Sequence, residues 1–124
     1  MTTEEFIVKD DTPTSSTYKR MTANGSESTY RDEASTFSNP RTIRVSHQKA
    51  SSSSGADRTL VEFARVDDNT DGVPRKGSVH TVFNQPREGV TQANILLEWE
   101  KMKNHIDANI GEYIAGFFPD TDCP

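Results

Sequence analysis

The C-terminal part of the chain has the hydrophobic pattern of a helix. Between residues 91 and 118, apolar side chains recur at intervals of three or four, which places them on one face of a helix. Gly111 interrupts this segment, so we expect two consecutive helices with Thr91 as the first N-cap. Asn94 stands where a capping box would have Glu or Gln. The apolar stripe consists of Ile95, Trp99, Met102, Ile106, Ile110, Tyr113 and Phe117.

The preceding part of the chain has the pattern of short strands separated by polar turns. Asn24-Gly25 between two β-compatible segments is a strong hairpin signal. The polar segment 51–55 is expected to be a hairpin loop rather than a linker, because each half of the chain is short for a domain. The polar segment 67–77 predicts a long loop. Strands are expected at 5–9, 17–23, 26–32, 42–49, 58–66 and 78–84, with a break at 10–13.

Alternation along the last three strands predicts a sheet with one apolar and one polar face. The apolar face would carry Ile43, Val45, Val61, Phe63, Val79 and Phe83. The polar face would carry Arg44, Ser46, Gln48, Arg58, Ser78 and His80. Antiparallel strands followed by helices predict an α+β fold in which two C-terminal helices can cover the apolar face.

Composition indicates that a single copy of this chain has few apolar residues with which to form a core. The chain has 124 residues, only 31% of them hydrophobic, and a mean hydropathy of −0.77. These values approach those of disordered chains, but the apolar residues are patterned rather than scattered. One domain that shares its core with a second copy fits both observations.

Charge is unevenly distributed along the chain. Residues 41–65 contain five basic and two acidic side chains, whereas residues 88–124 contain two basic and seven acidic ones. Residues 1–40 contain four basic and seven acidic ones, and residues 66–87 have three of each. The distribution favours a basic sheet surface and an acidic helical surface, although local excesses of this size also arise without function.

The sequence predicts no catalytic site, no cofactor and no metal site. It lacks the motifs of nucleophilic hydrolases, zinc proteases and nucleotide-binding loops. Cys123 is the single cysteine, which excludes a disulfide within the chain and leaves an unused thiol or an interchain link. His47 alternates with two apolar residues and is expected to be packed, whereas His105 is expected to be exposed. A signal peptide and a membrane span are not expected.

Four segments together resemble a known protein family. The strands RTIRVSHQKA, RTLVEFARVDD and GSVHTVFNQP precede LLEWEKMKNHIDANIGEYIAGFF, in which E-W-E-x-x-K is the best local signal. Their order resembles that of the coat proteins of small single-stranded RNA bacteriophages, the levivirus type. The resemblance covers nearly the whole chain. It implies one coat-protein domain, 1–124, with N-terminal strands at 1–34, an RNA-facing sheet at 41–85 and helices at 91–118.

The resemblance also implies an assembly. Two subunits of such proteins join their sheets edge to edge, and the helices of each lie over the partner's sheet. The dimers form a quasi-equivalent icosahedral shell around the RNA genome, with the helices outside and the sheet inside. The dimer binds an RNA hairpin, which represses translation of the replicase and directs packaging. The protein would occur in the virion and, during assembly, in the cytoplasm of the bacterial host, with no membrane partner.

Carried over by position, the resemblance assigns residues to three surfaces. The RNA-binding residues would be Arg44, Ser46, Gln48, Lys49, Arg58, Glu62, Ser78 and His80. The dimer interface would contain Ile95, Trp99, Met102 and Ile106. The loop between dimers would contain Asp68, Asn69, Asp71, Gly72 and Pro74 and, lacking cysteine, no disulfide.

Two points remain open at the level of sequence. The polar face has no obvious aromatic residue for base stacking, and Glu62 would repel phosphate unless it is paired. The alternative reading is a small dimeric RNA-binding regulator that forms no shells. Salt-dependent RNA binding without particles would identify it.

Overall fold

The computed structural model describes residues 4–10, 14–52 and 55–115. The chain divides into two compact units, Met1–Arg87 and Glu88–Pro124. The first unit is a six-stranded sheet in which each strand pairs antiparallel with the next, in the order β1-β2-β3-β4-β5-β6. The strands are β1 Glu5–Lys9, β2 Ser15–Asn24, β3 Glu27–Asp32, β4 Arg41–Gln48, β5 Ala56–Asp68 and β6 Pro74–Pro86.

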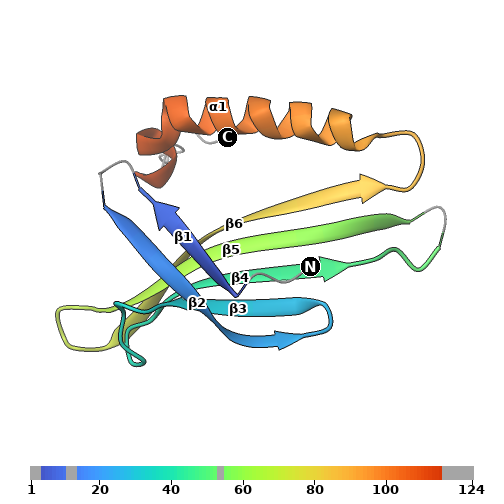
Figure 1. The fold of residues 1–124 in the computed structure, drawn as a ribbon. Coiled ribbons are helices and arrows are strands. Elements are labelled where there is room, and N and C mark those ends of the chain that lie inside the picture. Colours follow the sequence, from blue (N-terminus) through green and yellow to red (C-terminus); the bar gives the residue numbers. More distant parts are fainter. Residues whose placement is uncertain (1–3, 11–13, 53–54, 116–124) are drawn as a thin grey trace. The chain divides into compact units, whose positions relative to one another are not determined.

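The sheet is strongly curled, so that its first two strands cross over the others (Figure 1). The rings of Phe6 on β1 and Tyr30 on β3 lie 4.6 Å apart, and those of Tyr18 on β2 and Phe63 on β5 lie 6.3 Å apart. In a flat sheet, strands two or three positions apart would be separated by roughly 10 to 15 Å. A register shift between Arg20 and Thr22 marks a bulge in β2, a device that bends strands.

The curl creates a small core on the concave face. Tyr30 and Ile43 are each 2% exposed and Tyr18 is 9% exposed, and Phe6, Val8 and Val45 pack against them. Farther along the same face, Phe63 and Val79 remain 40% and 73% exposed. The unit therefore buries the β1–β4 part of its apolar face and leaves the β5–β6 part partly exposed.

The predicted hairpins are present, but three strands, β2, β5 and β6, are longer than expected. Asn24 pairs with Glu27, and Gly25 adopts a positive φ of 41°, as a tight turn requires. The segment at 51–55 joins β4 to β5, with residues 53–54 outside the described part. The expected break at 10–13 lies between β1 and β2, mostly outside the described residues.

The loop predicted at 67–77 is present but is shorter than expected. β5 and β6 stay paired as far as Asp68 and Pro74, which leaves a turn of only Asn69–Val73. The Asn69 side-chain oxygen accepts hydrogen bonds of 2.9 Å from the backbone N–H groups of Asp71 and Val73, and Gly72 has a φ of 78°. This Asx-type turn closes the hairpin. The strand ends beside the turn can be polar, because both of their faces are exposed.

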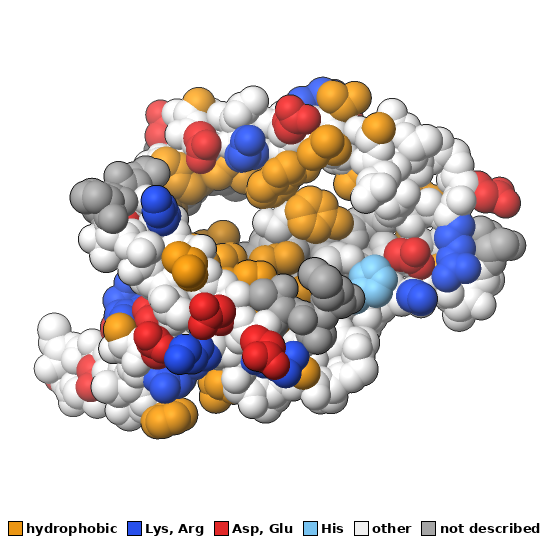
Figure 2. Space-filling model, viewed as in Figure 1, with side chains coloured by type: hydrophobic (Ala, Val, Ile, Leu, Met, Phe, Trp, Pro, Cys, Tyr) orange, Lys and Arg blue, Asp and Glu red, His pale blue; other side chains and the backbone are white. Residues whose placement is uncertain are grey.

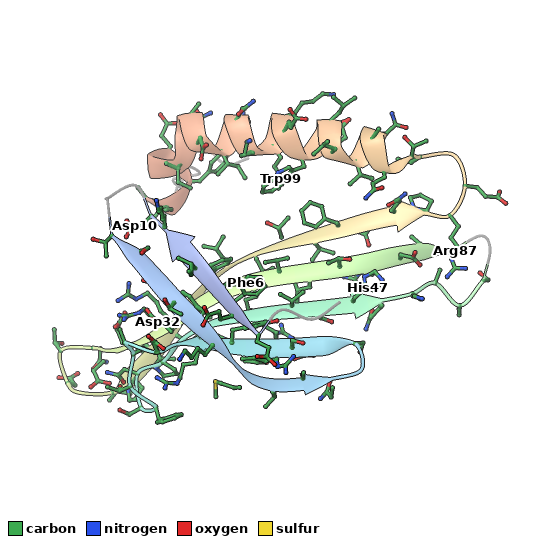
Figure 3. All side chains as sticks on the ribbon, in the orientation of Figure 1. Phe6, Asp10, Asp32, His47, Arg87 and Trp99 are labelled. Atoms are coloured by element: carbon green, nitrogen blue, oxygen red, sulfur yellow. The ribbon has the colours of Figure 1, made fainter. Side chains whose placement is uncertain are left out.

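His47 is exposed, contrary to the prediction of a packed histidine. It lies near the end of β4, beyond the small core, and its Nδ1 is 2.8 Å from Thr59 Oγ1 (Figure 3). Alternation placed it correctly on the face of Ile43 and Val45, but the core does not extend that far along the strand.

The described part of the second unit contains α1 Gln92–Ile114, which is interrupted by a kink, and the expected pair of consecutive helices stays a prediction. Thr91 is the N-cap, as predicted, and Asn94 completes a capping box with it. The backbone leaves helical geometry at Asn109 (φ −127°, ψ 15°) rather than at Gly111, and Asn109 Nδ2 donates to His105 O at 2.9 Å. The predicted extension to residue 118, together with Phe117 and Cys123, lies outside the described residues.

No residue of the described helix is buried. Ile95, Trp99 and Ile106 are partly exposed, while Met102 and Ile110 are 40% and 45% exposed. Figure 2 shows hydrophobic side chains reaching the surface of this unit. On its polar side, Lys101 pairs with Glu98 at 3.3 Å, and His105 is exposed, as the sequence predicted.

Candidate nucleic-acid interface

The register of β4, β5 and β6 brings most of the predicted RNA-binding residues onto one face. Arg44 pairs with Glu62, which pairs with His80, so these three side chains form a row across the strands. Since residues two apart share a face, the same surface contains Ser46, Gln48, Arg58 and Ser78. We call this surface the polar face. Lys49 is exposed but lies beyond the end of β4 and is not part of it.

Glu62 is the centre of a charge network on the polar face. Its side chain is 12% exposed, and its Oε1 lies 3.4 Å from Arg44 Nε and 3.8 Å from Lys76 Nζ. Its Oε2 lies 3.9 Å from His80 Nδ1. A carboxylate shared among cations in this way does not present a free negative charge to a ligand. Glu62 therefore positions the basic side chains of the polar face.

Two members of this network were missed by the sequence analysis. Glu27 on β3 approaches Arg44 Nη1 at 3.8 Å. Lys76 was assigned to a loop, whereas the longer β6 places it on the polar face, two residues before Ser78. Continuing the alternation back from Ser78 would have found Lys76, but the surrounding polar residues resemble those of a loop.

Arg58 differs from Arg44 in its surroundings. It pairs in register with Gln48 and Asn84, and its side chain is exposed. Among the described residues, no carboxylate forms an ion pair with it. An exposed guanidinium of this kind is suited to bind a phosphate group through charge-assisted hydrogen bonds.

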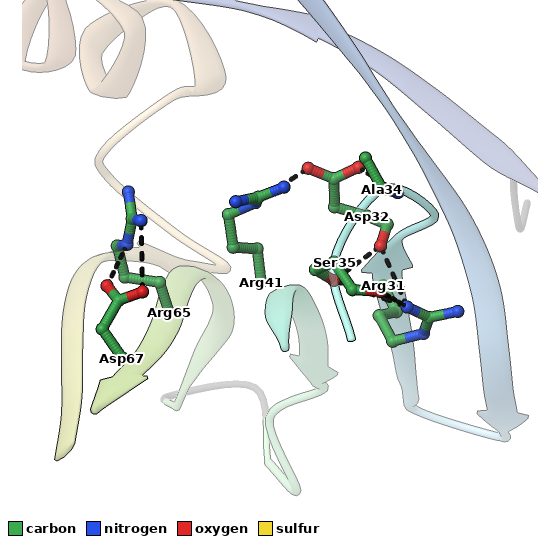
Figure 4. A network of polar contacts seen from close by, with 7 residues as sticks. All are labelled: Arg31, Asp32, Ala34, Ser35, Arg41, Arg65 and Asp67. Carbon is green, nitrogen blue, oxygen red and sulfur yellow. Dashed lines mark hydrogen bonds and ion pairs between the residues drawn. The ribbon is translucent and has the colours of Figure 1, made fainter. Parts of the chain in front are cut away.

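Two arginines on the opposite face, Arg41 and Arg65, are paired with aspartates. Arg41 Nε lies 2.9 Å from Asp32 Oδ2, and Arg65 Nε lies 2.7 Å from Asp67 Oδ2 (Figure 4). The hydrogen bond from Arg65 lowers the pKa of Asp67, and the same bond raises the pKa of Arg65. Each carboxylate offsets the positive charge of its arginine. This face is less suited than the polar face to binding a polyanion.

An open cavity of about 330 Å³ lies on the paired-arginine side of the sheet. Its apolar walls include Tyr18, Phe63 and Val79, with Arg41 and Arg65 at its margin. Burial raises the pKa of the Tyr18 hydroxyl, so this group remains neutral over the physiological range. The cavity offers apolar surface and no charged group without a partner aspartate.

The residues predicted to contact other subunits occupy two separate places. Asp68 and Pro74 form the last pair of β5 and β6, and the turn between them contains Asn69, Asp71 and Gly72. The predicted dimer residues Ile95, Trp99, Met102 and Ile106 lie on one side of α1. No partner chain is present, so these assignments remain predictions.

Other kinds of site find no support in the part of the chain that the structure describes. Within it, no group of three or more His, Cys, Asp or Glu side chains is arranged to hold a metal ion. No helix within it combines the length and the apolar composition needed to cross a membrane.

Comparison with known proteins identifies relatives of this fold only through structure. No protein-family model and no curated protein matches the sequence. The fold is similar to the protein of a virus-like particle of bacteriophage AVE019, with a TM-score of 0.76 and 10% identity, over 94% of this chain and 96% of that one.

Two further structures are similar over almost their whole length. A virus-like particle protein of Wenzhou levi-like virus 1 has a TM-score of 0.65 and 21% identity, over 94% of this chain and 98% of that one. A virus-like particle protein of bacteriophage NT-214 has a TM-score of 0.66 and 15% identity, over 93% of this chain and 94% of that one. The chain therefore has the fold of the proteins that form the virus-like particles of levi-like bacteriophages.

Proposed function

We propose that this chain is the coat protein of a single-stranded RNA bacteriophage, which forms dimers that assemble into an icosahedral shell. The observation that carries the proposal is the end-to-end similarity to proteins of virus-like particles, which covers 94% of this chain at a TM-score of 0.76. A fold is often shared by proteins of different function. Two features of this chain therefore add independent support.

The first feature is the amount of surface that a single copy leaves uncovered. No residue of the described apolar stripe is fully buried, and Phe63 and Val79 on the sheet are 40% and 73% exposed. Patches of this kind mark interaction surfaces. In the proposed dimer, the helix of each copy covers the partly exposed β5–β6 part of the other copy's apolar face. This arrangement would supply the core that the polar sequence lacks.

The second feature is the edge of the sheet. β6 has 13 residues and a hydrogen-bonded neighbour, β5, on one side only. A long exposed edge strand is a template for pairing with another chain. In the proposed dimer, two β6 strands pair and the sheets become continuous, so that the polar faces of both copies form one surface.

That joined polar face is the proposed RNA-binding surface of the dimer. Arg44, Lys76 and Arg58 would contact phosphates, and His80, Ser78, Ser46 and Gln48 would contact unpaired bases of an RNA hairpin. Binding of this hairpin would repress translation of the replicase and direct packaging. The protein would then occur in the virion and, before assembly, in the bacterial cytoplasm.

Expression in bacteria, followed by size-exclusion chromatography and negative-stain electron microscopy, tests the coat function. Closed particles of uniform diameter that protect RNA from nuclease are the expected result. A monodisperse monomer under all conditions of salt and pH would contradict the proposal. A stable dimer that binds RNA but forms no particles would identify a regulatory protein instead.

A further inference from the structure

The segment between β3 and β4 presents an aromatic side chain to solvent. Phe37 is 78% exposed, the largest exposure of any aromatic residue that the structure describes. Its ring is not isolated, because the Arg31 guanidinium carbon lies 4.2 Å from the ring centroid. This distance is within the range of a cation–π interaction. One side of the ring therefore rests on a cation, and most of the remaining surface is accessible.

Arg31 belongs to the polar face. It pairs in register with Thr42, two residues from Arg44 on the same strand, so its side chain leaves the sheet on the side of Arg44. β3 is next to β4 in the sheet. The Arg31–Phe37 pair is therefore at the β3 margin of the polar face, where the sequence analysis found no aromatic residue on the strands themselves.

Hydrogen bonds hold this pair in place before any ligand binds. Arg31 Nη1 donates to the carbonyl oxygen of Asp32 at 3.2 Å and to that of Ser35. Ser35 Oγ in turn donates to Asp32 O at 2.6 Å, and the Asp32 carboxylate accepts from the Ala34 N–H at 3.0 Å (Figure 4). These bonds fix the chain immediately before Phe37.

The chain after Phe37 is fixed in a similar way. Thr36 Oγ1 accepts a hydrogen bond of 3.0 Å from the Asn39 N–H and lies 3.3 Å from Ser38 Oγ. The ring is thus carried on a short turn that is bonded on both sides. A preorganised aromatic side chain loses little conformational entropy when a ligand stacks on it.

We propose that Phe37, supported by Arg31, is a stacking platform for an unpaired base of single-stranded RNA at the margin of the polar face. Stacking of bases on aromatic side chains tolerates any sequence, because every base has a π-face. The guanidinium beneath the ring and Arg44 on the neighbouring strand provide positive charge for the adjoining phosphates. This proposal rests on the proposed RNA-binding function and adds a contact outside the three strands β4 to β6.

The test compares variants of the full chain in RNA binding at fixed salt. The probe is a short fluorescent oligoadenylate, and its affinity is measured by fluorescence anisotropy. Phe37→Leu keeps an apolar side chain but removes the π-face, and we expect affinity to fall by roughly 5- to 100-fold. Phe37→Tyr should restore wild-type affinity. The dependence of affinity on salt should not change, because no phosphate contact is lost.

An oligonucleotide that contains 2-aminopurine reports stacking directly. Its fluorescence should be more strongly quenched by the wild type than by Phe37→Leu when both are saturated. Ile7→Ala, which removes a 67% exposed apolar side chain from β1, is the control and should bind as the wild type does. Circular dichroism of each variant verifies that the fold is retained.

Three results would overturn the proposal in distinguishable ways. If Phe37→Leu binds RNA normally while Arg58→Gln binds weakly, the polar face binds RNA but Phe37 does not stack. If Phe37→Leu stops particle assembly and leaves RNA binding unchanged, Phe37 contacts another protein subunit. If the wild type itself binds no RNA, the proposed RNA-binding function fails together with the platform.

Discussion

Arg44 Nε lies 3.4 Å from Glu62 Oε1, on a surface that is proposed to bind a polyanion. The carboxylate also approaches Lys76 and His80 and is only 12% exposed. It therefore holds the basic groups in a defined arrangement and lowers the net positive charge available to RNA. In the proposed complex with RNA, this arrangement would reduce affinity while fixing the positions of the cations.

Replacing Glu62 with Gln should strengthen RNA binding. The variant keeps the shape of the side chain and releases Arg44 and Lys76 from their shared carboxylate. If one further phosphate contact forms, the slope of log affinity against log salt should become steeper by about 0.7 for a single strand. Filter binding of a single-stranded RNA at several salt concentrations measures both quantities.

Glu98→Gln is the matched control for this prediction. It changes the net charge by the same amount, but on the helix, where Glu98 pairs with Lys101 and both side chains are mostly exposed. Equal gains in both variants would show that total charge, not the Glu62 network, limits affinity. Weaker binding by Glu62→Gln would show that the carboxylate positions the cations for a specific contact.

Replacing Trp99 with Ala should prevent the formation of dimers. Trp99 lies on the apolar stripe of α1, and loss of a large buried anchor costs about 3–5 kcal/mol when it packs in an interface. Native mass spectrometry should show monomer or aggregate in place of dimer. Leu97→Ala is the control, since Leu97 is 56% exposed and lies about 200° around the helix from Trp99. Unchanged dimers in Trp99→Ala would place Trp99 outside the interface.

Replacing Asp32 with Asn should destabilise the sheet. Asp32 is 1% exposed and accepts hydrogen bonds from Arg41 Nε and the Ala34 N–H. The amide cannot reproduce both, and a buried polar group left unsatisfied costs about 1–3 kcal/mol. Urea denaturation at fixed protein concentration measures the loss. Asp107→Asn, at an exposed position of the helix, should have little effect. A similar loss in both variants would contradict the structural role of Asp32.

Stability should depend on pH through Asp57 at the base of the β4–β5 loop. A hydrogen bond of 2.7 Å from the Ala50 N–H, helped by Arg87 at 3.6 Å, lowers the pKa of Asp57. Because the pKa of Asp57 is lower in the folded protein than in the unfolded chain, the ionised group stabilises the fold at pH values above the ordinary aspartate pKa of about 3.9. This stabilisation is lost as the pH falls through the lowered value.

Asp57→Asn should therefore be less stable than the wild type at neutral pH, and the difference should shrink in acid. Urea denaturation of both proteins near pH 7 and near pH 3 tests this expectation. Asp71→Asn, in the exposed turn between β5 and β6, is the control. A difference that persists unchanged in acid would show that the amide disturbs the loop by its shape rather than by its charge.

Local alternation predicted much of the sheet but not its curvature. The faces of β4, β5 and β6 follow directly from alternation, and the polar face was assembled correctly from seven of its residues. Tyr18 and Tyr30 were not recognised as core residues, because their neighbours in sequence are mostly polar and their burial depends on the curl of β1 and β2. Such contacts between distant strands leave no local signal.

The ends of strands and helices, and the roles of single residues, were harder to predict than the face of the sheet on which a residue lies. Lys76 was missed because charged residues can occupy a strand that is exposed on both sides, and polarity alone does not separate such a strand from a loop. The helix bends at Asn109 rather than at Gly111, since the Asn109 side chain can replace a backbone donor to His105 O. One feature of the sequence could have indicated that Phe37 is exposed: it is an aromatic residue within the polar segment Ser35-Thr36-Phe37-Ser38-Asn39.

The two prolines that bound β6 have a consequence for symmetry. Pro74 and Pro86 have no N–H to donate, and β6 runs from one to the other. If two copies of this strand pair antiparallel over their full length, the molecular twofold axis passes beside the residue midway between the prolines, His80. The imidazoles of the two subunits would then be neighbours across the axis, each within reach of its own Glu62. The spacing of the two prolines would thus determine where the twofold axis of the dimer lies.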